Sequence, residues 1–196
     1  MYEDMDWCEG VKINRPVKDF ELDAYHNSKI SKWHSKNARG KWLVVMFYPA
    51  DFTFVCPTEL EEAARLHKDF EKAGAELVSI STDTAFVHKA WHDHSPAIKK
   101  VEFPMLADPT GKVTRQFGVY IDEEGLALRG TFVIDPKGIL KTIEIHDNAI
   151  GRNIEETLRK ILAANYVATH KGEVCPVSWK PGGKTIKPSE RLIGAI

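Results

Sequence analysis

The sequence predicts an α/β domain with an extension at its amino end and an arm at its carboxyl end. First, residues 42–48 form a near-continuous apolar run, which is typical of a central strand buried on both faces. Second, apolar residues recur at helical spacing over residues 60–73, with Gly74 as the stop. Third, strand-like runs at residues 126–134 and 139–145 flank the turn Pro136-Lys137-Gly138.

The remaining elements of the amino-terminal half follow from local patterns. Apolar residues at 20, 22 and 24 alternate with acidic ones and predict a half-buried strand. Residues 27–39 are polar and rich in Ser and Lys, so we expect a loop. Residues 77–80 predict a second short buried strand. Thr82-Asp83-Thr84 offers N-cap residues to a helix that we expect to end at Pro96.

The carboxyl-terminal half predicts a short helical stretch at residues 113–117 and a last helix marked by apolar residues from 154 to 162. The order from residue 42 is therefore a βαβ half followed by a ββα half. This is the thioredoxin-like arrangement, with right-handed crossovers. We expect one domain over residues 1–170, and residues 171–196 as an irregular arm of that domain, because they lack periodicity.

Composition excludes several classes of function. Hydrophobic residues make up 43% and charged residues 28% of the chain, and the net charge is −1. We therefore expect neither a nucleic-acid partner nor a membrane partner, and no apolar run reaches the ~20 residues that span a bilayer. The acidic start lacks the pattern of a signal peptide, so the expected location is the cytoplasm. The 3 cysteines are too few for a disulfide scaffold.

Cys56 directly follows the apolar run and precedes the first predicted helix. A cysteine at a helix start faces free backbone N–H groups and the positive end of the helix dipole, which favour the thiolate over the thiol. Pro57 fits the first helical turn, and Thr53 places a hydroxyl three residues upstream. The alternative is a buried structural cysteine. The expected apolar walls of the pocket are Pro49, Phe52 and Phe54.

The run Pro49-x-x-x-Thr53-x-x-Cys56 resembles the active-site signature of the peroxiredoxins, which reduce hydroperoxides without metal or haem. Residues 47–59 are close to the form in the peroxidase subunit of bacterial alkyl hydroperoxide reductase, the AhpC-like subfamily. Residues 129–136 and 172–176 also match that subfamily, in order, and the resemblance extends from about residue 40 to 196. It implies a thioredoxin-like fold, an antioxidant thiol peroxidase and no cofactor.

The resemblance also implies roles for single residues. Cys56 is the nucleophile, Thr53 hydrogen-bonds the sulfur and the peroxide, and Pro49 keeps water from the thiolate. Arg129 is the expected donor to the reacting oxygens, because its rigid guanidinium can contact two atoms at once. The supporting residues match positions near the family's active-site arginine network, although ordinary surface charge is the alternative for each; they are Glu59 and Arg152.

Cys175, in the run Glu173-Val174-Cys175-Pro176, resembles the resolving cysteine of the typical two-cysteine class. There the sulfenic acid of the first cysteine condenses with the resolving cysteine of a partner subunit. The resemblance thus implies a homodimer, commonly assembled into a ring of dimers such as a decamer. The disulfide is re-reduced either by a flavoprotein disulfide reductase that draws on NADH or by thioredoxin, and the sequence leaves both open.

Other conspicuous residues predict no chemistry. Cys8 has no counterpart in the pattern and is expected to be a bystander. His88, His92 and His94 include a pair four residues apart, but no third ligand is apparent, so we expect a solvated helix face rather than a metal site. Trp91 is expected to pack in the core or an interface.

Two other functions stay open at this point. A general thiol–disulfide oxidoreductase fits the fold, but it normally uses Cys-x-x-Cys, and Glu59 stands where the second cysteine would be. A chaperone-like or structural ring is also possible as an added role. Consumption of peroxide by the reduced protein distinguishes a peroxidase from both.

Overall fold

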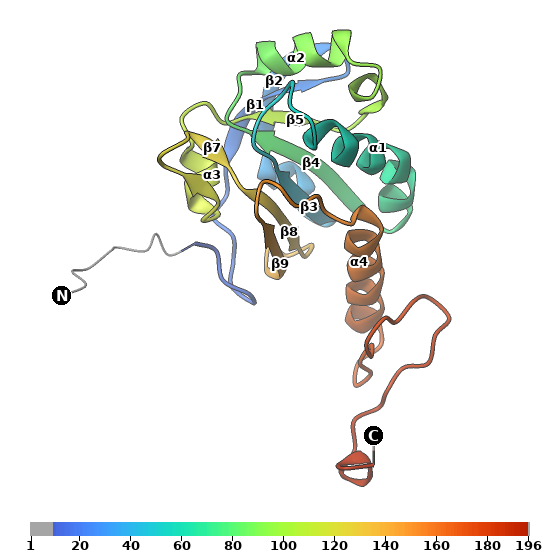
Figure 1. Cartoon of the computed structure of the whole chain (residues 1–196). Coiled ribbons are helices and arrows are strands. Elements are labelled where there is room, and N and C mark those ends of the chain that lie inside the picture. The colour runs from blue at the N-terminus through green and yellow to red at the C-terminus, as the bar shows by residue number, and fades with distance from the viewer. Residues whose placement is uncertain (1–9, 196) are drawn as a thin grey trace, which may run out of the picture. The chain divides into compact units, whose positions relative to one another are not determined.

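A seven-stranded mixed sheet in the order β2-β1-β5-β4-β3-β8-β9 organises the fold (Figure 1). Within it, β3 runs parallel to β4 and β4 parallel to β5, whereas the other neighbours are antiparallel. The strands are β1 (Glu21–His26), β2 (Lys29–His34), β3 (Trp42–Phe47), β4 (Ala75–Ser81), β5 (Met105–Ala107), β8 (Arg129–Ile134) and β9 (Leu140–His146), with β6 (Tyr120–Ile121) and β7 (Leu126–Ala127) paired separately.

The computed structural model describes residues 10–195, so Cys8 lies outside the described residues. The chain divides into two compact units, Met1–Ile154 and Glu155–Ile196. In the first unit α1 packs against β4, and α2 packs against β1 and β5. The helices are α1 (Cys56–Lys72), α2 (Ala85–His94), α3 (Lys112–Gln116) and α4 (Ile154–Thr169), with the 3-10 helices η1 (Ser35–Ala38), η2 (Ile98–Lys100) and η3 (Glu190–Leu192).

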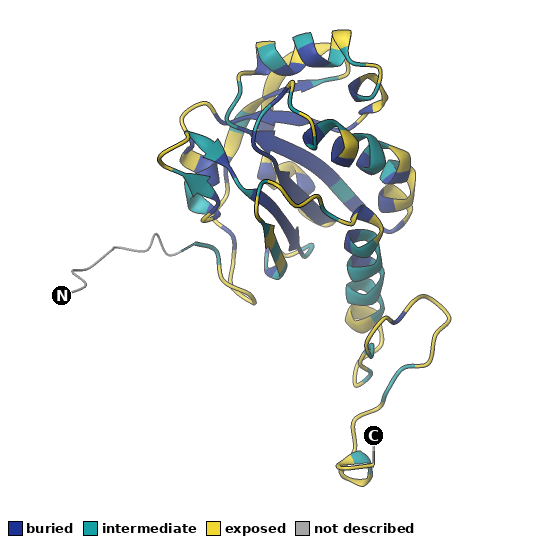
Figure 2. Cartoon of the chain, in the orientation of Figure 1, coloured by how far each residue is buried: buried dark blue, intermediate teal, exposed yellow. Residues whose placement is uncertain are grey.

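The core of the first unit forms around β3, whose six residues are all buried, as predicted from its unbroken apolar run (Figure 2). Aromatic rings fill the space beside it: Phe117 lies 5.1 Å from Phe47 and 4.8 Å from Phe132, measured between ring centroids. The predicted hairpin after residue 126 is also present. It turns at Pro136-Lys137-Gly138 between β8 and β9. These two strands extend the sheet beyond β3, and β8 begins with Arg129 of the candidate site.

The prediction of a loop at residues 27–39 is wrong. Instead β2 pairs with β1 through a tight turn, in which Asn27 and Ser28 both have positive φ angles, and η1 follows. Five of the six residues of β2 are exposed because it is the edge strand, so its sequence lacks the alternation that marks a half-buried strand. The three-residue strand β5 and the two-residue strand β6 are too short to leave a pattern.

The prediction of a solvated histidine face on α2 is wrong for His88, whose side chain is fully buried. Its Nδ1 lies 2.8 Å from Asp51 Oδ2, and its Nε2 lies 3.0 Å from the carbonyl oxygen of Leu106. The buried face of α2 consists of Ala85, His88 and Trp91 at a spacing of three, which packs against the sheet. The packing expected of Trp91 is thus confirmed.

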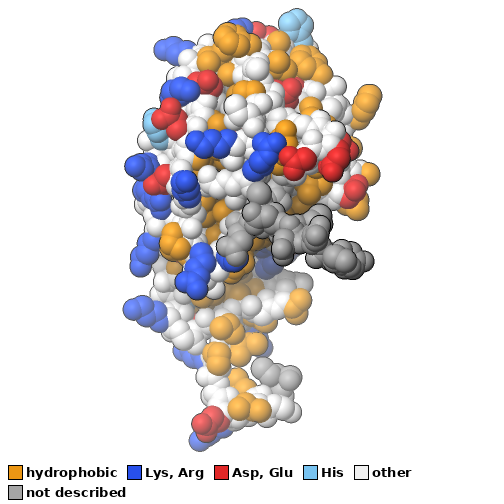
Figure 3. All heavy atoms as spheres, turned by 90° about the vertical axis from the view of Figure 1, so that its left-hand side faces the viewer, with side chains coloured by type: hydrophobic (Ala, Val, Ile, Leu, Met, Phe, Trp, Pro, Cys, Tyr) orange, Lys and Arg blue, Asp and Glu red, His pale blue; other side chains and the backbone are white. Residues whose placement is uncertain are grey.

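Among residues 10–195 no helix is long and apolar enough to cross a membrane. On the face shown in Figure 3, basic and acidic side chains are interspersed and apolar ones reach the surface between them. The exposed large apolar side chains of the first unit include Phe52, Phe54 and Phe86, and Ile143 and Ile145 of the edge strand β9. These side chains leave apolar area on the surface of the unit that a further copy of the chain could cover.

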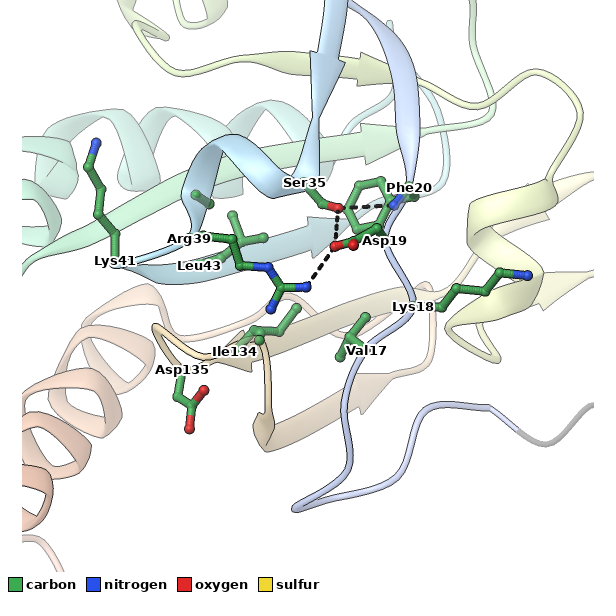
Figure 4. A pocket seen from close by; sticks show the side chains of 12 residues that line it. Val17, Lys18, Asp19, Phe20, Ser35, Arg39, Lys41, Leu43, Ile134 and Asp135 are labelled. Carbon is green, nitrogen blue, oxygen red and sulfur yellow. Dashed lines mark hydrogen bonds and ion pairs between the residues drawn. The ribbon is translucent and has the colours of Figure 1, made fainter.

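A small cavity of about 20 Å³ lies beside the amino end of β3 (Figure 4). It has room for about one water molecule and no larger ligand. Arg39 closes it by donating from Nη2 to Asp19 Oδ1 at 2.7 Å and from Nη1 to the Lys137 carbonyl at 2.8 Å. Ser35 joins the same carboxylate at 3.3 Å. The cavity is therefore a structural junction at which Arg39 links Asp19, in the segment before β1, to the β8–β9 turn.

Gly138→Ala is expected to destabilise the fold by about 2–4 kcal/mol, as the sum of left-handed strain and lost hydrogen bonds. Gly138 has a φ of +83°, and a Cβ there would lie 1.3 Å from Arg39 Nη1. The flexible Arg39 must then leave both of its acceptors. Urea unfolding measures the loss. Gly74→Ala is the matched control, because Gly74 has a φ of +74° but nothing within 4 Å. Equal losses in the two variants would show that Arg39 contributes nothing.

Candidate active site

Cys56 is the first residue of α1 and is fully buried, directly after the loop that leaves the carboxyl end of β3. The predicted helix start is confirmed: Val55 is the N-cap residue, and Pro57 occupies the first turn, where its missing N–H costs no hydrogen bond. The sequence folds this way because the proline fixes φ near its helical value and the apolar face of α1 packs against β4. The sulfur therefore lies at the amino end of the helix dipole.

Arg129, the first residue of β8, brings its guanidinium to this sulfur. Its Nη1 lies 3.4 Å from Cys56 Sγ and 2.8 Å from Glu59 Oε2. Its Nε and Nη2 both donate to the carbonyl oxygen of Asn148, at 3.0 and 2.9 Å. The arginine is only 3% exposed, so its charge acts on the sulfur with little screening by water. This contact places a full positive charge beside the Cys56 sulfur.

Glu59 forms buried ion pairs with two arginines, Arg129 and Arg152. Neither Glu59 nor Arg152 is therefore an ordinary surface charge. Arg152 donates from Nη2 to Glu59 Oε2 at 2.8 Å and from Nε to Oε1 at 3.0 Å. Burial alone would raise the pKa of Glu59, but the hydrogen bonds and charges of Arg152 and Arg129 outweigh it and hold that pKa below its usual range. The two guanidiniums and one carboxylate leave one positive charge in excess. A Cys56 thiolate would balance it.

Thr53 and Pro49 lie in the loop before Cys56. Pro49 is buried, and Thr53 is half-buried with its hydroxyl donating to the Ala50 carbonyl at 2.9 Å. The hydroxyl proton is therefore committed, and the Thr53 oxygen remains free to accept a hydrogen bond. The expectation of an aromatic wall is wrong for Phe54, whose side chain is 93% exposed. Phe52, with a φ of +55°, is also mostly exposed.

A buried polar platform behind this loop was not predicted from the sequence. Asp51 accepts the hydroxyl of Tyr48 at 2.7 Å and contacts His88, and its own N–H donates to Asp83. Burial raises the pKa of Tyr48, and the negative charge of Asp51 raises it further. The spacing of His88 with Ala85 and Trp91 was the signal that could have placed it on the buried face. The platform fixes the loop that carries Thr53.

Cys175 belongs to the second unit, where the arm is more ordered than its sequence predicts. Glu173 accepts hydrogen bonds from Tyr166 at 2.8 Å and from Thr185 at 2.6 Å, which binds the arm to α4. The Cys175 sulfur is half-buried and lies 3.8 Å from the Ala163 carbonyl. Burial raises the pKa of the Cys175 thiol and the Glu173 carboxylate adds to this, while Arg159 opposes it. The thiol form therefore prevails at neutral pH.

In the described part of the chain no cluster of three or more His, Cys, Asp or Glu side chains could hold a metal ion. The groups gathered at the candidate site are a sulfur, two guanidiniums and a carboxylate, all nearly fully buried. A thioredoxin-like sheet with a buried cysteine at a helix start, contacted by an arginine from a neighbouring strand, defines a protein of the redox-active thiol class.

Comparison with known proteins identifies the family within this class. The AhpC/TSA family matches residues 13–143, and the C-terminal domain of 1-Cys peroxiredoxin matches residues 164–193. Alkyl hydroperoxide reductase C of Pseudomonas aeruginosa is 54% identical over 184 residues, which cover 94% of this chain and 98% of that protein. The Escherichia coli K12 protein of the same name is 48% identical over the same shares of the two chains.

Two solved structures show the same family resemblance. Enterococcus faecalis AhpC superposes with a TM-score of 0.81 at 44% identity, covering 84% of this chain and 98% of that one. Reduced Plasmodium vivax 2-Cys peroxiredoxin gives 0.87 at 30% identity, covering 91% and 94%. The chain therefore belongs to the AhpC/TSA family of peroxiredoxins, which are oxidoreductases with peroxidase activity. The predicted thioredoxin-like fold is thereby confirmed.

Proposed function

We propose that this chain reduces hydrogen peroxide and organic hydroperoxides to water and alcohols in antioxidant defence, with Cys56 as the nucleophile. The observation that carries the proposal is the 3.4 Å contact between Arg129 Nη1 and the Cys56 sulfur, both buried. An arginine beside a cysteine at a helix start stabilises the thiolate, and the thiolate is the form of cysteine that attacks an O–O bond. The relatives support the same chemistry, since their names are those of hydroperoxide reductases.

In the first step the Cys56 thiolate attacks one peroxide oxygen. A sulfur–oxygen bond forms, the O–O bond breaks, and the leaving oxygen takes a proton to become water or an alcohol. Negative charge moves from sulfur to the leaving oxygen, so donors placed between them lower the barrier. Arg129 is the donor in this proposal, Thr53 accepts from the peroxide O–H, and Pro49 excludes water. Glu59 and Arg152 hold the orientation of Arg129.

In the second step the Cys56 sulfenic acid condenses with Cys175 of the partner subunit, releasing water and forming an intersubunit disulfide. Burial raises the pKa of the Cys175 thiol in its place against α4. An external dithiol then reduces the disulfide, supplied by an NADH-dependent flavoprotein disulfide reductase or by thioredoxin. In this proposal residues 1–170 form the peroxidase domain, and residues 171–196 are an arm of the same domain that carries Cys175.

Two exposed apolar surfaces support a homodimer that assembles into a ring of dimers, a decamer. One is the edge strand β9 of the described sheet, where the side chains of Ile143 and Ile145 are exposed. The other contains Phe86 of α2 and Phe52 of the active-site loop. Association through the first would form dimers and association through the second would join them. Sedimentation velocity measures the size of the assembly.

Cys175→Ser is expected to abolish covalent dimers on a non-reducing gel after one equivalent of peroxide. The variant should still consume one equivalent per subunit and then stop, because its sulfenic acid has no resolving thiol. Cys8→Ser is the control and should form dimers as the parent chain does. Loss of the dimers in Cys8→Ser would overturn the assignment of Cys175, and failure of the reduced parent chain to consume peroxide would overturn the proposed function.

The reductant is tested separately. Reconstitution with a flavoprotein disulfide reductase or with thioredoxin and its reductase, while nicotinamide oxidation is followed, shows which one sustains turnover. Peroxide-dependent oxidation with the first system alone is the result expected if the chain follows its alkyl hydroperoxide reductase relatives. Turnover with thioredoxin alone would reject the flavoprotein partner.

A further inference from the structure

The guanidinium of Arg129 is held from two opposite directions. On one side Nη1 reaches Glu59 and the Cys56 sulfur. On the other side Nε and Nη2 converge on a single backbone oxygen, the carbonyl of Asn148, at 3.0 and 2.9 Å. A planar fork held at both ends cannot rotate about its own axis. The carbonyl of Asn148 and the carboxylate of Glu59 together therefore set where Nη1 lies relative to the sulfur.

Asn148 presents this carbonyl from a tight turn after β9. The N–H of Ile150 donates to the carbonyl of Asp147 at 3.0 Å, which closes a β-turn with Asn148 and Ala149 at its centre. The Asp147 carboxylate accepts the N–H of Ala149 at 2.8 Å, as aspartate commonly does at the first position of a turn. The Asn148 carbonyl and the Ala149 N–H belong to the same planar peptide unit, so this hydrogen bond fixes the direction in which the carbonyl points.

The strand pairing places this turn directly beside Arg129. Arg129 and His146 are cross-strand partners at the ends of β8 and β9, and the turn follows His146 immediately. His146 lies 3.3 Å from the Ile150 carbonyl through Nδ1 and 2.9 Å from Glu144 through Nε2, so it braces the far side of the turn. Neither contact reaches the sulfur. The turn contacts the site most directly through Arg129, and two residues after it the N–H of Arg152 donates to Glu59 at 2.9 Å.

We propose that the turn Asp147–Ile150 is a positioning element for the peroxidase reaction, with Asp147 as the residue that holds the Asn148 carbonyl in register with Arg129. The inference rests on the proposed function, in which Arg129 stabilises the transition state. If the Asn148 carbonyl moves, Nε and Nη2 of Arg129 lose their acceptor. The guanidinium is then held by Glu59 alone and can change its orientation. Nη1 then shifts away from the position that the peroxide oxygens require.

The test is the second-order rate constant of reduced Cys56 with hydrogen peroxide, measured by stopped-flow tryptophan fluorescence. Asp147→Ala is expected to lower this constant by about 10–100-fold, since a 1 Å misplacement of a catalytic group costs about 100-fold. Asp147→Asn keeps the oxygen that accepts the Ala149 N–H, so it should restore most of the rate. A rate within twofold of the parent chain in Asp147→Ala would overturn the proposal.

A matched control separates positioning from loss of stability. Asp135 caps the other end of the same hairpin, where Oδ1 accepts the N–H groups of Lys137 and Ile139, each at 2.9 Å. Asp135→Ala should reduce the urea midpoint at least as much as Asp147→Ala while the peroxide rate stays unchanged. Sedimentation must show the same assembly size for each variant, because β9 lies at the sheet edge. Equal rate losses in the two variants would show that Asp147 contributes only to the stability of the fold and does not position Arg129.

A double-mutant cycle then shows whether the effect passes through the arginine. In an Arg129→Lys background the Asn148 carbonyl no longer receives a fork, so Asp147→Ala should cost less than about twofold. An undiminished loss in that background would place the action of Asp147 elsewhere. The outcomes stay distinct from those of the proposed function: if the parent chain does not reduce peroxide, that function fails, whereas an active parent with an insensitive Asp147→Ala variant rejects the positioning role alone.

Discussion

Cys56→Ser is expected to reduce peroxide consumption to the uncatalysed rate. The serine hydroxyl cannot replace the thiolate that the proposed first step requires, and it cannot form a sulfenic acid or a disulfide. The fold should survive, because serine is slightly smaller than cysteine and is accepted at helix starts. The measurement is peroxide loss over one turnover by pre-reduced protein, together with the urea midpoint of the variant.

The Cys175→Ser variant is the informative comparison, since it removes the other described thiol but leaves Cys56. It should consume one equivalent of peroxide as fast as the parent chain, while Cys56→Ser consumes none. If Cys56→Ser retained a first turnover, the reacting thiol would have to be Cys175 or Cys8. The burial of Cys56 next to Arg129 would then be structural, as a lone buried cysteine often is.

The sequence predicted the parts of the fold that depend on long, regular patterns. The unbroken apolar run of β3 and the apolar spacing of α1 were enough to place Cys56 at a strand–helix junction. The turn Pro136-Lys137-Gly138 placed the β8–β9 hairpin in the same way. The family resemblance then supplied the partners of Cys56, which no periodicity could have chosen from among the 27 basic residues.

What could not be predicted depends on contacts between distant segments. Glu59 and Arg152 were each as consistent with surface charge as with a site, because a sequence does not show that both side chains lose their water. The Asn148 carbonyl is a backbone atom, so its role leaves no trace in side-chain identity. The strand β2 was missed for a related reason: an edge strand exposes both faces and its polar sequence resembles a loop.

Arg129→Lys is expected to lower the second-order rate constant with hydrogen peroxide by between about 10- and 1000-fold, since removing one preorganised donor costs about 100–1000-fold. Lysine keeps the positive charge but has no fork. It cannot contact Glu59, the sulfur and the Asn148 carbonyl at once, as the guanidinium does. Stopped-flow measurement with hydrogen peroxide and with an organic hydroperoxide gives the rate constants.

The size of the loss separates charge from geometry. If the positive charge alone stabilised the transition state, Arg129→Lys would react at nearly the parent rate and only a neutral variant such as Arg129→Gln would fail. If the fork matters, both variants fall together. Arg152→Lys provides the calibration, because Arg152 binds the same carboxylate without a hydrogen bond to the sulfur. Its loss should be smaller than that of Arg129→Lys, since Arg152 affects the reacting atoms indirectly, through Glu59 and the carbonyl of Gly130.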